Sequence, residues 1–349
     1  MNKYPYKNES NVLDSLYNIL IYIYNIFFTV FSSFNKLQFL NKLFIIFLIL
    51  LFITILFNTS NNVSNYYLLE NYNNIDTNEK YVKKVDTDIY DNFYSKYYDA
   101  IHLNKKRNEY ELEQIKKLSN KKTTDKILDI GCGTGYTVNI FNDLNYNIEG
   151  LDLSEDMISK AQSNYPKCKF ILGDILTSNF LDFDAYSHIL CLGKTIYEIK
   201  EKNIFFENCS SILSKDGFLI IHLVDRNKFK PYVQNKDSDT LYDPEKYGKK
   251  VTEMIVKFDN DNEFISKYKI INSDNNNQID STITPYASYN EKFSNFKTHN
   301  TRENEINLYM PETIKILNLA KSKNFKFLKK IDLQAVDYNN EYLYIFKKI

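Results

Sequence analysis

A short apolar run that leads directly into three glycines limits how this chain can fold more than any other feature. The run is KILDI, residues 126–130, and the glycines lie in GCGTG, residues 131–135, in a chain of 349 residues with only eight glycines. Glycine alone tolerates positive φ and lets the backbone approach a ligand with no Cβ in the way. The pattern therefore predicts a strand that ends in a ligand-binding loop.

Strand-like and helix-like segments alternate around this loop. This alternation predicts an α/β fold, with a doubly wound, mostly parallel sheet and helices on both faces. Ligands of such sheets bind at the carboxyl ends of the strands, where the glycine loop lies. Besides 126–130, the predicted strands are 148–152, 169–172, 187–192 and 218–224, and the predicted helices are 88–119, 137–144, 154–163 and 202–213.

A β-rich insertion is predicted after the fifth strand, at about 230–305. It contains the stretches VTEMIVKFD and EFISKYKII and an Asn-rich turn, NSDNNNQID. Two strands with such a turn predict a hairpin. We expect the insertion to form a cap over the substrate.

Two kinds of ligand compete for the glycine loop. A dinucleotide site needs the spacing G-x-G-x-x-G, with the diphosphate at the N-terminus of the following helix. Here the third glycine comes one residue too early, and Asp129 precedes the loop inside the strand. A carboxylate is a poor neighbour for a diphosphate and a good one for a cation. The ligand is therefore expected to carry a positive group near this loop.

The segment from Asp129 to Gly135 resembles the first motif of the class I S-adenosylmethionine-dependent methyltransferases, an acid followed by G-x-G-x-G. The resemblance covers about residues 88–349. It implies a seven-stranded sheet, for which residues 308–333 and 341–349 supply the final helix and the last two strands, the final one antiparallel. It also implies that S-adenosylmethionine is the cofactor.

The same resemblance implies roles for residues at successive strand ends. Asp152 would bind both ribose hydroxyls, because a carboxylate has two oxygens that can accept from a diol. Asp174 would face the adenine amino group, with Ile175 packed on the ring, and Tyr94 or Tyr98 of the preceding aromatic helix would touch the methionine end. The implied cofactor-binding residues are Asp129, Gly131, Cys132, Gly133, Gly135, Asp152, Leu153, Asp174, Ile175 and Tyr98.

The sequence says less about the methyl acceptor than about the cofactor. Residues 190–199 (LCLGKTIYEI) follow the fourth strand, near which the methyl group usually points in the family, and lack the Asn/Asp-Pro-Pro-Tyr signature of enzymes that methylate amide or base nitrogens. A small molecule, a lipid or a protein all stay possible as acceptors. Possible bases at this edge are Tyr197, Glu198, His222 and Asp225. The catalytic candidates are Tyr197, Asp225 and His222; a core role for His222 and an ion pair for Asp225 are the alternatives.

Charge and cysteine content narrow the class of partners. Lysine plus arginine and aspartate plus glutamate number 44 each, so no overall field favours nucleic acid. The basic stretch at 105–126 is interrupted by three glutamates, which favours a solvated helix. The four cysteines are scattered singly, without a CxxC pair, which favours buried reduced thiols over a disulfide framework or a metal site.

The N-terminal region has a different composition. Residues 15–35 carry no charge, and a second apolar run follows at 43–57. The first run is long enough to cross a hydrocarbon core of about 30 Å, and the second nearly so. We expect a membrane anchor over 1–60, made of one or two hydrophobic helices, then a polar tether over 61–87 and a methyltransferase domain over 88–349. One span, two spans and a hairpin in one leaflet stay open.

The expected reading is a membrane-tethered methyltransferase whose domain faces the cytosol, where the cofactor is made. A nicotinamide-dependent oxidoreductase is the first alternative, disfavoured by the glycine spacing. A non-catalytic module that binds the cofactor as a scaffold is the second. The sequence leaves the oligomeric state open.

Overall fold

The computed structural model describes residues 38, 39, 41, 47, 48, 50, 51, 80–117, 125–177, 180–232, 251–257, 262–271 and 284–349. The chain divides into two compact units, Met1–Asn73 and Asn74–Ile349. The predicted hydrophobic run 15–35 and nearly all of 43–57 lie outside the described residues. Within the described part of the chain, no helix is both long and apolar enough to cross a membrane. The following paragraphs concern the second unit.

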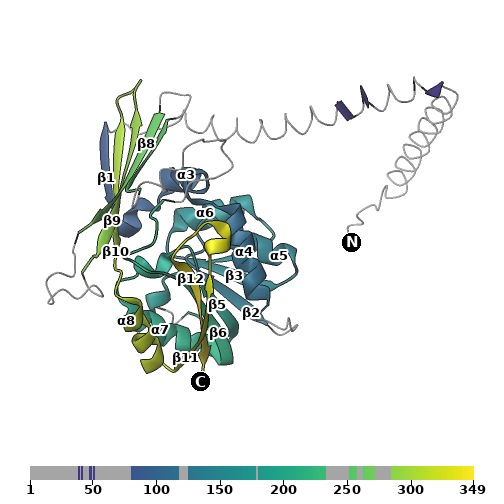
Figure 1. Cartoon of the computed structure of the whole chain (residues 1–349), viewed down its shortest axis with the longest axis vertical. Helices are drawn as coiled ribbons and strands as arrows, with labels where there is room; N and C mark the ends of the chain where they lie inside the picture. Colours follow the sequence, from purple (N-terminus) through teal and green to yellow (C-terminus); the bar gives the residue numbers. More distant parts are fainter. Residues whose placement is uncertain are drawn as a thin grey trace, which may run out of the picture. The chain divides into compact units, whose positions relative to one another are not determined.

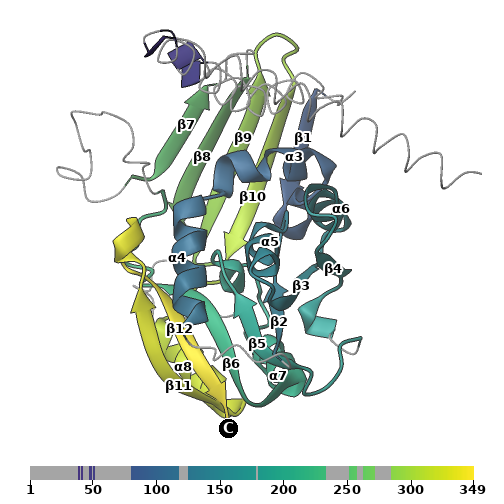
Figure 2. The same cartoon turned by 90° about the vertical axis from the view of Figure 1, so that its right-hand side faces the viewer.

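A seven-stranded sheet forms the centre of this unit (Figures 1 and 2). Its spatial order is β11-β12-β6-β5-β2-β3-β4, and β12 is antiparallel to both of its neighbours while the other pairs are parallel. This confirms the predicted doubly wound sheet with an antiparallel last strand. The strands are β2 (Lys126–Ile130), β3 (Asn147–Asp152), β4 (Lys169–Leu172), β5 (Tyr186–Cys191), β6 (Leu213–Val224), β11 (Phe325–Asp332) and β12 (Glu341–Lys348).

Helices cover both faces of the sheet, as predicted. On one face α4 (Lys105–Lys116) packs on α5 (Tyr136–Asp143), and α5 packs on β3. On the opposite face α7 (Lys202–Ile212) packs on β6 and α8 (Thr313–Ser322), which covers β11 (Figure 1). The strand β2 is buried over nearly its whole length, because a central parallel strand is covered on both sides. The remaining helix of the core, α6 (Glu155–Asn164), packs on β3 and β4.

The order of the strands fixes where a ligand can bind. The chain runs from β2 outward to β3 and β4, and then returns to the other side of β2 as β5 and β6. Loops that leave β2 and β5 therefore diverge at their carboxyl ends, and such a switch point is the usual ligand crevice of a doubly wound sheet. The glycine loop follows β2 at this point.

A second sheet of five strands lies beyond the carboxyl ends of the central strands (Figure 2). The strands β7 (Glu253–Lys257) and β8 (Asn262–Ile270) pair antiparallel, as predicted for a hairpin, but the Asn-rich turn follows β8 and does not join the two. The strands β9 (Ala287–Asn295) and β10 (Thr301–Leu308) extend this pair, which the sequence did not predict. The Asn-rich turn at 272–280 lies outside the described residues. The fifth strand, β1 (Tyr81–Val85), pairs parallel with β10.

The strand β1 changes the expected domain bounds. The sequence predicts a polar tether up to residue 87, whereas Tyr81–Val85 is a strand and Asp86–Ile89 is a 3-10 helix, η2. A short, half-exposed edge strand such as YVKKV leaves little apolar signal, because only every second residue touches protein. The second sheet is therefore built from a strand that precedes the central sheet in the sequence and from the insertion between β6 and β11.

Two further predicted elements differ from the structure. The helix expected over 88–119 breaks at Leu103 into α3 (Asn92–His102) and α4, since the Asn104 side chain caps α4 by accepting from the Arg107 amide at 2.9 Å. The break expected between the helix 202–213 and the strand 218–224 is a bulge inside β6, with Asp216 at φ 64° and a register shift against β5. A bulge keeps the ladder going where a turn would end it.

Candidate functional site

A cavity of about 460 Å³ opens at the switch point, above the carboxyl ends of β2, β3 and β4. Its wall combines the glycine loop, the ends of these strands and the entry to α3. Of the ten predicted cofactor-binding residues, seven line it: Gly131, Gly133, Asp152, Leu153, Asp174, Ile175 and Tyr98. Four separate segments of the sequence therefore meet in one cavity.

The three glycines of the loop have different structural roles. All have positive φ, at 69° for Gly131, 53° for Gly133 and 88° for Gly135. A Cβ on Gly133 would stand 3.4 Å from the Tyr98 ring, so glycine at this position leaves space for that ring in the cavity wall. Gly135 is the N-cap of α5 and packs against Phe170 behind the cavity. It supports the loop without lining the cavity, and so does the buried Cys132.

Asp152 lies at the end of β3 and joins that strand to the glycine loop. One carboxylate oxygen accepts from the Gly133 amide at 2.8 Å, and the other accepts from the Ser154 amide at 2.9 Å. Burial raises the pKa of this carboxyl, and the backbone hydrogen bonds oppose the rise. Each oxygen keeps a lone pair beyond these bonds, so a diol in the cavity has acceptors available.

Asp129 takes a different position from the one expected. It is buried in β2 and does not line the cavity. Burial raises its pKa to about 8, with nearby Glu111 and Asp152 adding to the rise. Desolvation favours the neutral acid, whereas a cation close by would favour the carboxylate. Asp129 therefore has no direct access to the space inside this cavity.

The third strand end is built as expected. Asp174 follows β4 and holds the next turn by accepting from the Leu176 amide at 2.8 Å. Ile175 begins the 3-10 helix η3 (Ile175–Thr177) and is 5% exposed. Both line the cavity, as does Leu153, which is half exposed. An acid and an apolar side chain therefore stand next to each other at the far end of the cavity.

The entry to α3 closes the cavity from above. Tyr90 and Tyr98 line it, and the Tyr90 hydroxyl donates to the Glu198 carboxylate at 2.6 Å. Glu198 follows the 3-10 helix η4 (Thr195–Tyr197). Its side chain is exposed and lines the cavity, with protein atoms around it. This burial within the fold raises its pKa to about 7. The only signal for Glu198 in the sequence is its position after the fourth strand, and none exists for Tyr90.

A second cavity, of about 340 Å³, lies between the central sheet and the second sheet. It shares Tyr90, Tyr98, Gly193 and Glu198 with the first, so the two cavities meet at these residues. Its other lining residues come from α3, α4, the loop after β5 and the strands of the second sheet. They include His102, Arg107, Lys194, Tyr197, Met254, Ser266, Tyr289, Glu291 and Leu308.

A buried hydrogen-bond network joins α3 to the second sheet at this cavity. The Tyr94 hydroxyl donates to Glu291 on β9 at 2.8 Å and lies 2.7 Å from the His102 ring. Burial raises the pKa of Glu291 to about 7 and lowers that of His102 to about 4. Tyr94, which the sequence offers beside Tyr98 for the methionine end, lines neither cavity and belongs to this network. The network fixes the second sheet relative to α3.

The three predicted catalytic residues differ in whether they line a cavity. Tyr197 lines the second cavity, but its hydroxyl accepts from the Val224 amide at 2.8 Å, and burial raises its pKa well above the usual range. His222 is completely buried and lines neither cavity. Asp225 lines neither cavity, and its carboxylate lies 3.5 Å from Lys228. Only Tyr197 therefore reaches the space next to the cofactor cavity.

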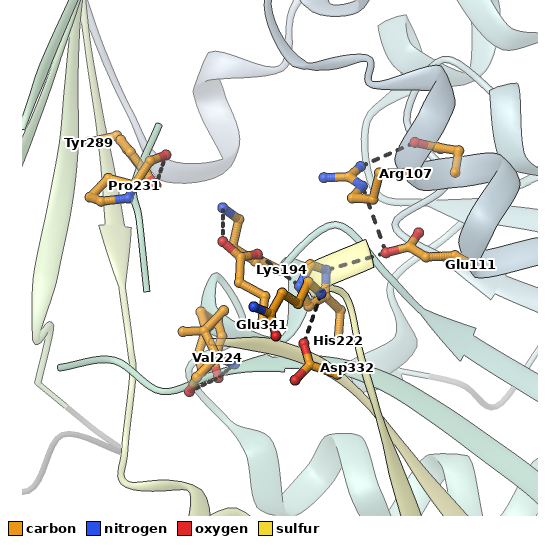
Figure 3. Close-up of polar contacts among 12 residues, drawn as sticks. Arg107, Glu111, Lys194, His222, Val224, Pro231, Tyr289, Asp332 and Glu341 are labelled. Atoms are coloured by element: carbon orange, nitrogen blue, oxygen red, sulfur yellow. Dashed lines mark hydrogen bonds and ion pairs between the residues drawn. The ribbon is translucent and has the colours of Figure 1, made fainter. Parts of the chain in front are cut away.

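His222 belongs to a charged cluster under the second cavity (Figure 3). Its ring nitrogens lie 2.9 Å from Glu341 and 3.7 Å from Glu111. Glu111 also faces Arg107 at 3.7 Å, and Glu341 faces Lys194 at 3.9 Å. The two cations line the cavity while the two acids and the histidine are buried below them. The cluster explains why a histidine is tolerated in the middle of β6, and gives it a supporting position.

Comparisons with known proteins bear on the family of this site. Residues 121–279 match the family model described as a methyltransferase domain. The chain is similar in structure to an S-adenosylmethionine-dependent methyltransferase from Clostridium acetobutylicum, with 17% identity, 73% of this chain and 96% of that chain covered, and a TM-score of 0.53. It is also similar to the CcbJ methyltransferase from Streptomyces caelestis, with 13% identity, 74% and 97% covered, and a TM-score of 0.53. No match was found among curated proteins.

The structural likenesses, at such low identities, establish the fold, and the family match covers the glycine loop, the ends of β3 and β4 and the loop after β5. Neither comparison favours the oxidoreductase alternative. The match over 121–279, on a chain with this strand order and cavity, supports a class I S-adenosylmethionine-dependent methyltransferase.

Proposed function

We propose that the chain binds S-adenosylmethionine in the first cavity and methylates a small molecule bound in the second. The observation that supports this arrangement is the meeting of the two cavities at Tyr90, Tyr98, Gly193 and Glu198. A methyl group that passes from one ligand to the other has to cross this junction. The proposal also includes attachment of the domain to a membrane through the hydrophobic N-terminal segments.

The residues of the first cavity fit the cofactor chemically. The Asp152 oxygens have lone pairs for the ribose diol, and Asp174 and Ile175 stand where an amino-substituted ring needs an acceptor and an apolar surface. A Cβ on Gly131 would clash with Thr195, and a Cβ on Gly133 would crowd the Tyr98 ring, so both positions are kept free of a side chain. Asp129, below the floor, would act on the ammonium group through water. Leu153 and Tyr98 complete the wall.

The bound cofactor supplies an electrophilic methyl group on a sulfonium. The protein then has to align the acceptor, exclude water and take up a proton where the nucleophile carries one. The aromatic side chains of α3 close the junction against solvent. Glu198, which lines both cavities and has a pKa of about 7, is the carboxylate placed to accept that proton. It is better placed for this role than His222 or Asp225.

Blocking the second cavity should stop transfer without weakening cofactor binding. Met254 points into this cavity from β7, while the next residue, Ile255, is 54% exposed on the other face of the strand. We expect Met254→Trp to lower the transfer of radiolabelled methyl into a small-molecule cell extract at least tenfold, at unchanged cofactor affinity. Ile255→Trp is the matched control and should keep both. Transfer mainly into the lipid or protein fraction would contradict a small-molecule acceptor.

The membrane proposal rests on the apolar runs at 15–35 and 43–57. We expect the full-length chain to stay in the membrane pellet after carbonate extraction, and a chain that starts at residue 74 to stay in the supernatant. Protease added to vesicles whose cytosolic face points outward should degrade residues 81–349. Protection of these residues in such vesicles would place the domain on the other side of the membrane.

A further inference from the structure

Glu198 lies where the two cavities meet, so its charge can act on the cofactor as well as accept a proton from the acceptor. We propose that Glu198 is the charge partner of the cofactor's sulfonium, so that the site distinguishes the charged cofactor from its neutral product. This inference rests on the proposed function, because it assumes that the methyl group faces the junction. A carboxylate at that point attracts S-adenosylmethionine, whose sulfur is a cation, more than S-adenosylhomocysteine, whose sulfur is neutral.

The surroundings of Glu198 support a carboxylate that titrates near neutrality. Among the described residues, the Tyr90 hydroxyl is the side chain that donates to it; this bond lowers its pKa, whereas burial raises it. The groups that act most strongly on its charge are phenols, carboxyls and one thiol. These groups are Tyr90, Tyr94 and Tyr98 from η2 and α3, Asp86, Cys191 from β5, Asp152 from β3 and Glu291 from β9. In the part of the chain that the structure describes, no ion pair reaches Glu198, although His102, Arg107 and Lys194 line the second cavity with it.

The charge balance of the reaction fits this assignment. Transfer breaks the bond between sulfur and the methyl carbon and forms a bond from that carbon to the acceptor's nucleophilic atom. The electron pair of the broken bond stays on sulfur, which becomes a neutral thioether. The proton of the nucleophile passes to Glu198. The positive charge and the negative charge thus disappear in one turnover, and the attraction that held the cofactor is lost when the product must leave.

The inference predicts a pH-dependent ratio of two affinities. The full-length chain, in detergent, is titrated calorimetrically with S-adenosylmethionine and with S-adenosylhomocysteine at several values between pH 6 and pH 8. Both ligands have the same amino-acid and adenosine groups, so the effects of Asp129 and Asp152 are expected to cancel in the ratio. For one pKa unit of coupling the full rise is tenfold, so we expect the preference for S-adenosylmethionine to rise about fivefold over this range, with a midpoint between pH 6 and pH 7.

Three variants separate Glu198 from its neighbours. Glu198→Gln keeps the shape and an acceptor for Tyr90, and should make the ratio independent of pH. Tyr90→Phe removes the hydrogen bond that lowers the pKa of Glu198, and should move the midpoint to higher pH. Glu291→Gln removes the other carboxyl with a pKa of about 7, which lines only the second cavity, and should keep the rise.

The outcomes distinguish this inference from the proposed function. A ratio that changes less than threefold in the wild type, or that rises equally in Glu198→Gln, overturns the role of Glu198. If Glu198→Gln fails to fold, the direction of the midpoint shift in Tyr90→Phe decides instead, and an unmoved midpoint overturns the inference. Failure of both ligands to bind the wild type at every pH would refute the cofactor site itself.

Discussion

Replacing Asp152 with alanine is expected to remove cofactor binding almost completely. Asp152 is the carboxylate at the end of β3 that lines the cavity, and its two oxygens already order the Gly133 and Ser154 amides. The loss of two hydrogen bonds from a diol to a charged acceptor costs about 3 kcal/mol, or roughly a hundredfold in affinity. The loop also loses its tie to β3, which adds to the effect.

A thermal-unfolding comparison measures this effect. Ligand at 100 times its dissociation constant adds about 2.7 kcal/mol to the stability of the wild type, which raises the midpoint by a few degrees. Asp152→Ala should show no such rise with S-adenosylmethionine or S-adenosylhomocysteine. Asp182→Ala, which removes an exposed carboxylate that lines neither cavity, is the control and should show the full rise. A normal rise in Asp152→Ala would mean that the ribose is held elsewhere.

The parts of the site that the sequence predicts are those where one residue type has one physical use. Positive φ at Gly131, Gly133 and Gly135 leaves glycine as the unstrained choice. The acids at the ends of β3 and β4 follow from the strand pattern, because parallel strands bring their carboxyl ends to one edge. The same pattern predicts β2, β3, β4 and β5 to within one residue, whereas β6 begins at Leu213, five residues before the predicted start. These features are local in the sequence, and a single chain therefore reveals them.

The second sheet and the junction are harder to predict, because they depend on contacts between distant segments. The strand β1 is held by pairing with β10, more than 200 residues away. Buried Arg302 on β10 donates to Asp91 and to the Ile89 carbonyl, which fixes the entry to α3. These contacts place Tyr90 against Glu198. In the sequence these residues are ordinary surface types, and only the fold gives the carboxyl its neutral-range pKa.

The charged cluster around His222 also shows what the sequence alone cannot predict, namely the direction of a side chain at a strand end. His222 and Asp225 follow the sequence pattern of residues at a catalytic strand end. The side chain of His222, however, lies under the second cavity between Glu111 and Glu341. Side chains alternate between the two faces of a strand, so strand position alone does not decide which face looks into a cavity. The sequence gives the strand end correctly and leaves the direction of each side chain undetermined.

Gly135→Ala is expected to destabilise the domain far more than Gly193→Ala, although both glycines have positive φ, at 88° and 62°. Alanine in this region costs about 1 kcal/mol in backbone strain at either position. At Gly135 the new Cβ would also stand 2.6 Å from the Phe170 ring and 3.0 Å from the Ala161 Cβ, whereas at Gly193 no atom lies within 4 Å. Such overpacking adds about 1–3 kcal/mol.

Phe170 has little freedom to relieve this clash. Its ring also approaches the position that a Cβ on Gly150 would take, at 2.9 Å, so two glycines on neighbouring strands and loops make room for one aromatic side chain. We therefore expect Gly135→Ala to lower the free energy of unfolding by roughly 3 kcal/mol, and Gly193→Ala by about 1 kcal/mol, in urea titrations without ligand. Phe170→Leu in the Gly135→Ala background should recover part of the loss, since a smaller side chain admits the Cβ. Equal losses in the two single variants would mean that strain at positive φ, and not packing behind the loop, dictates glycine at residue 135.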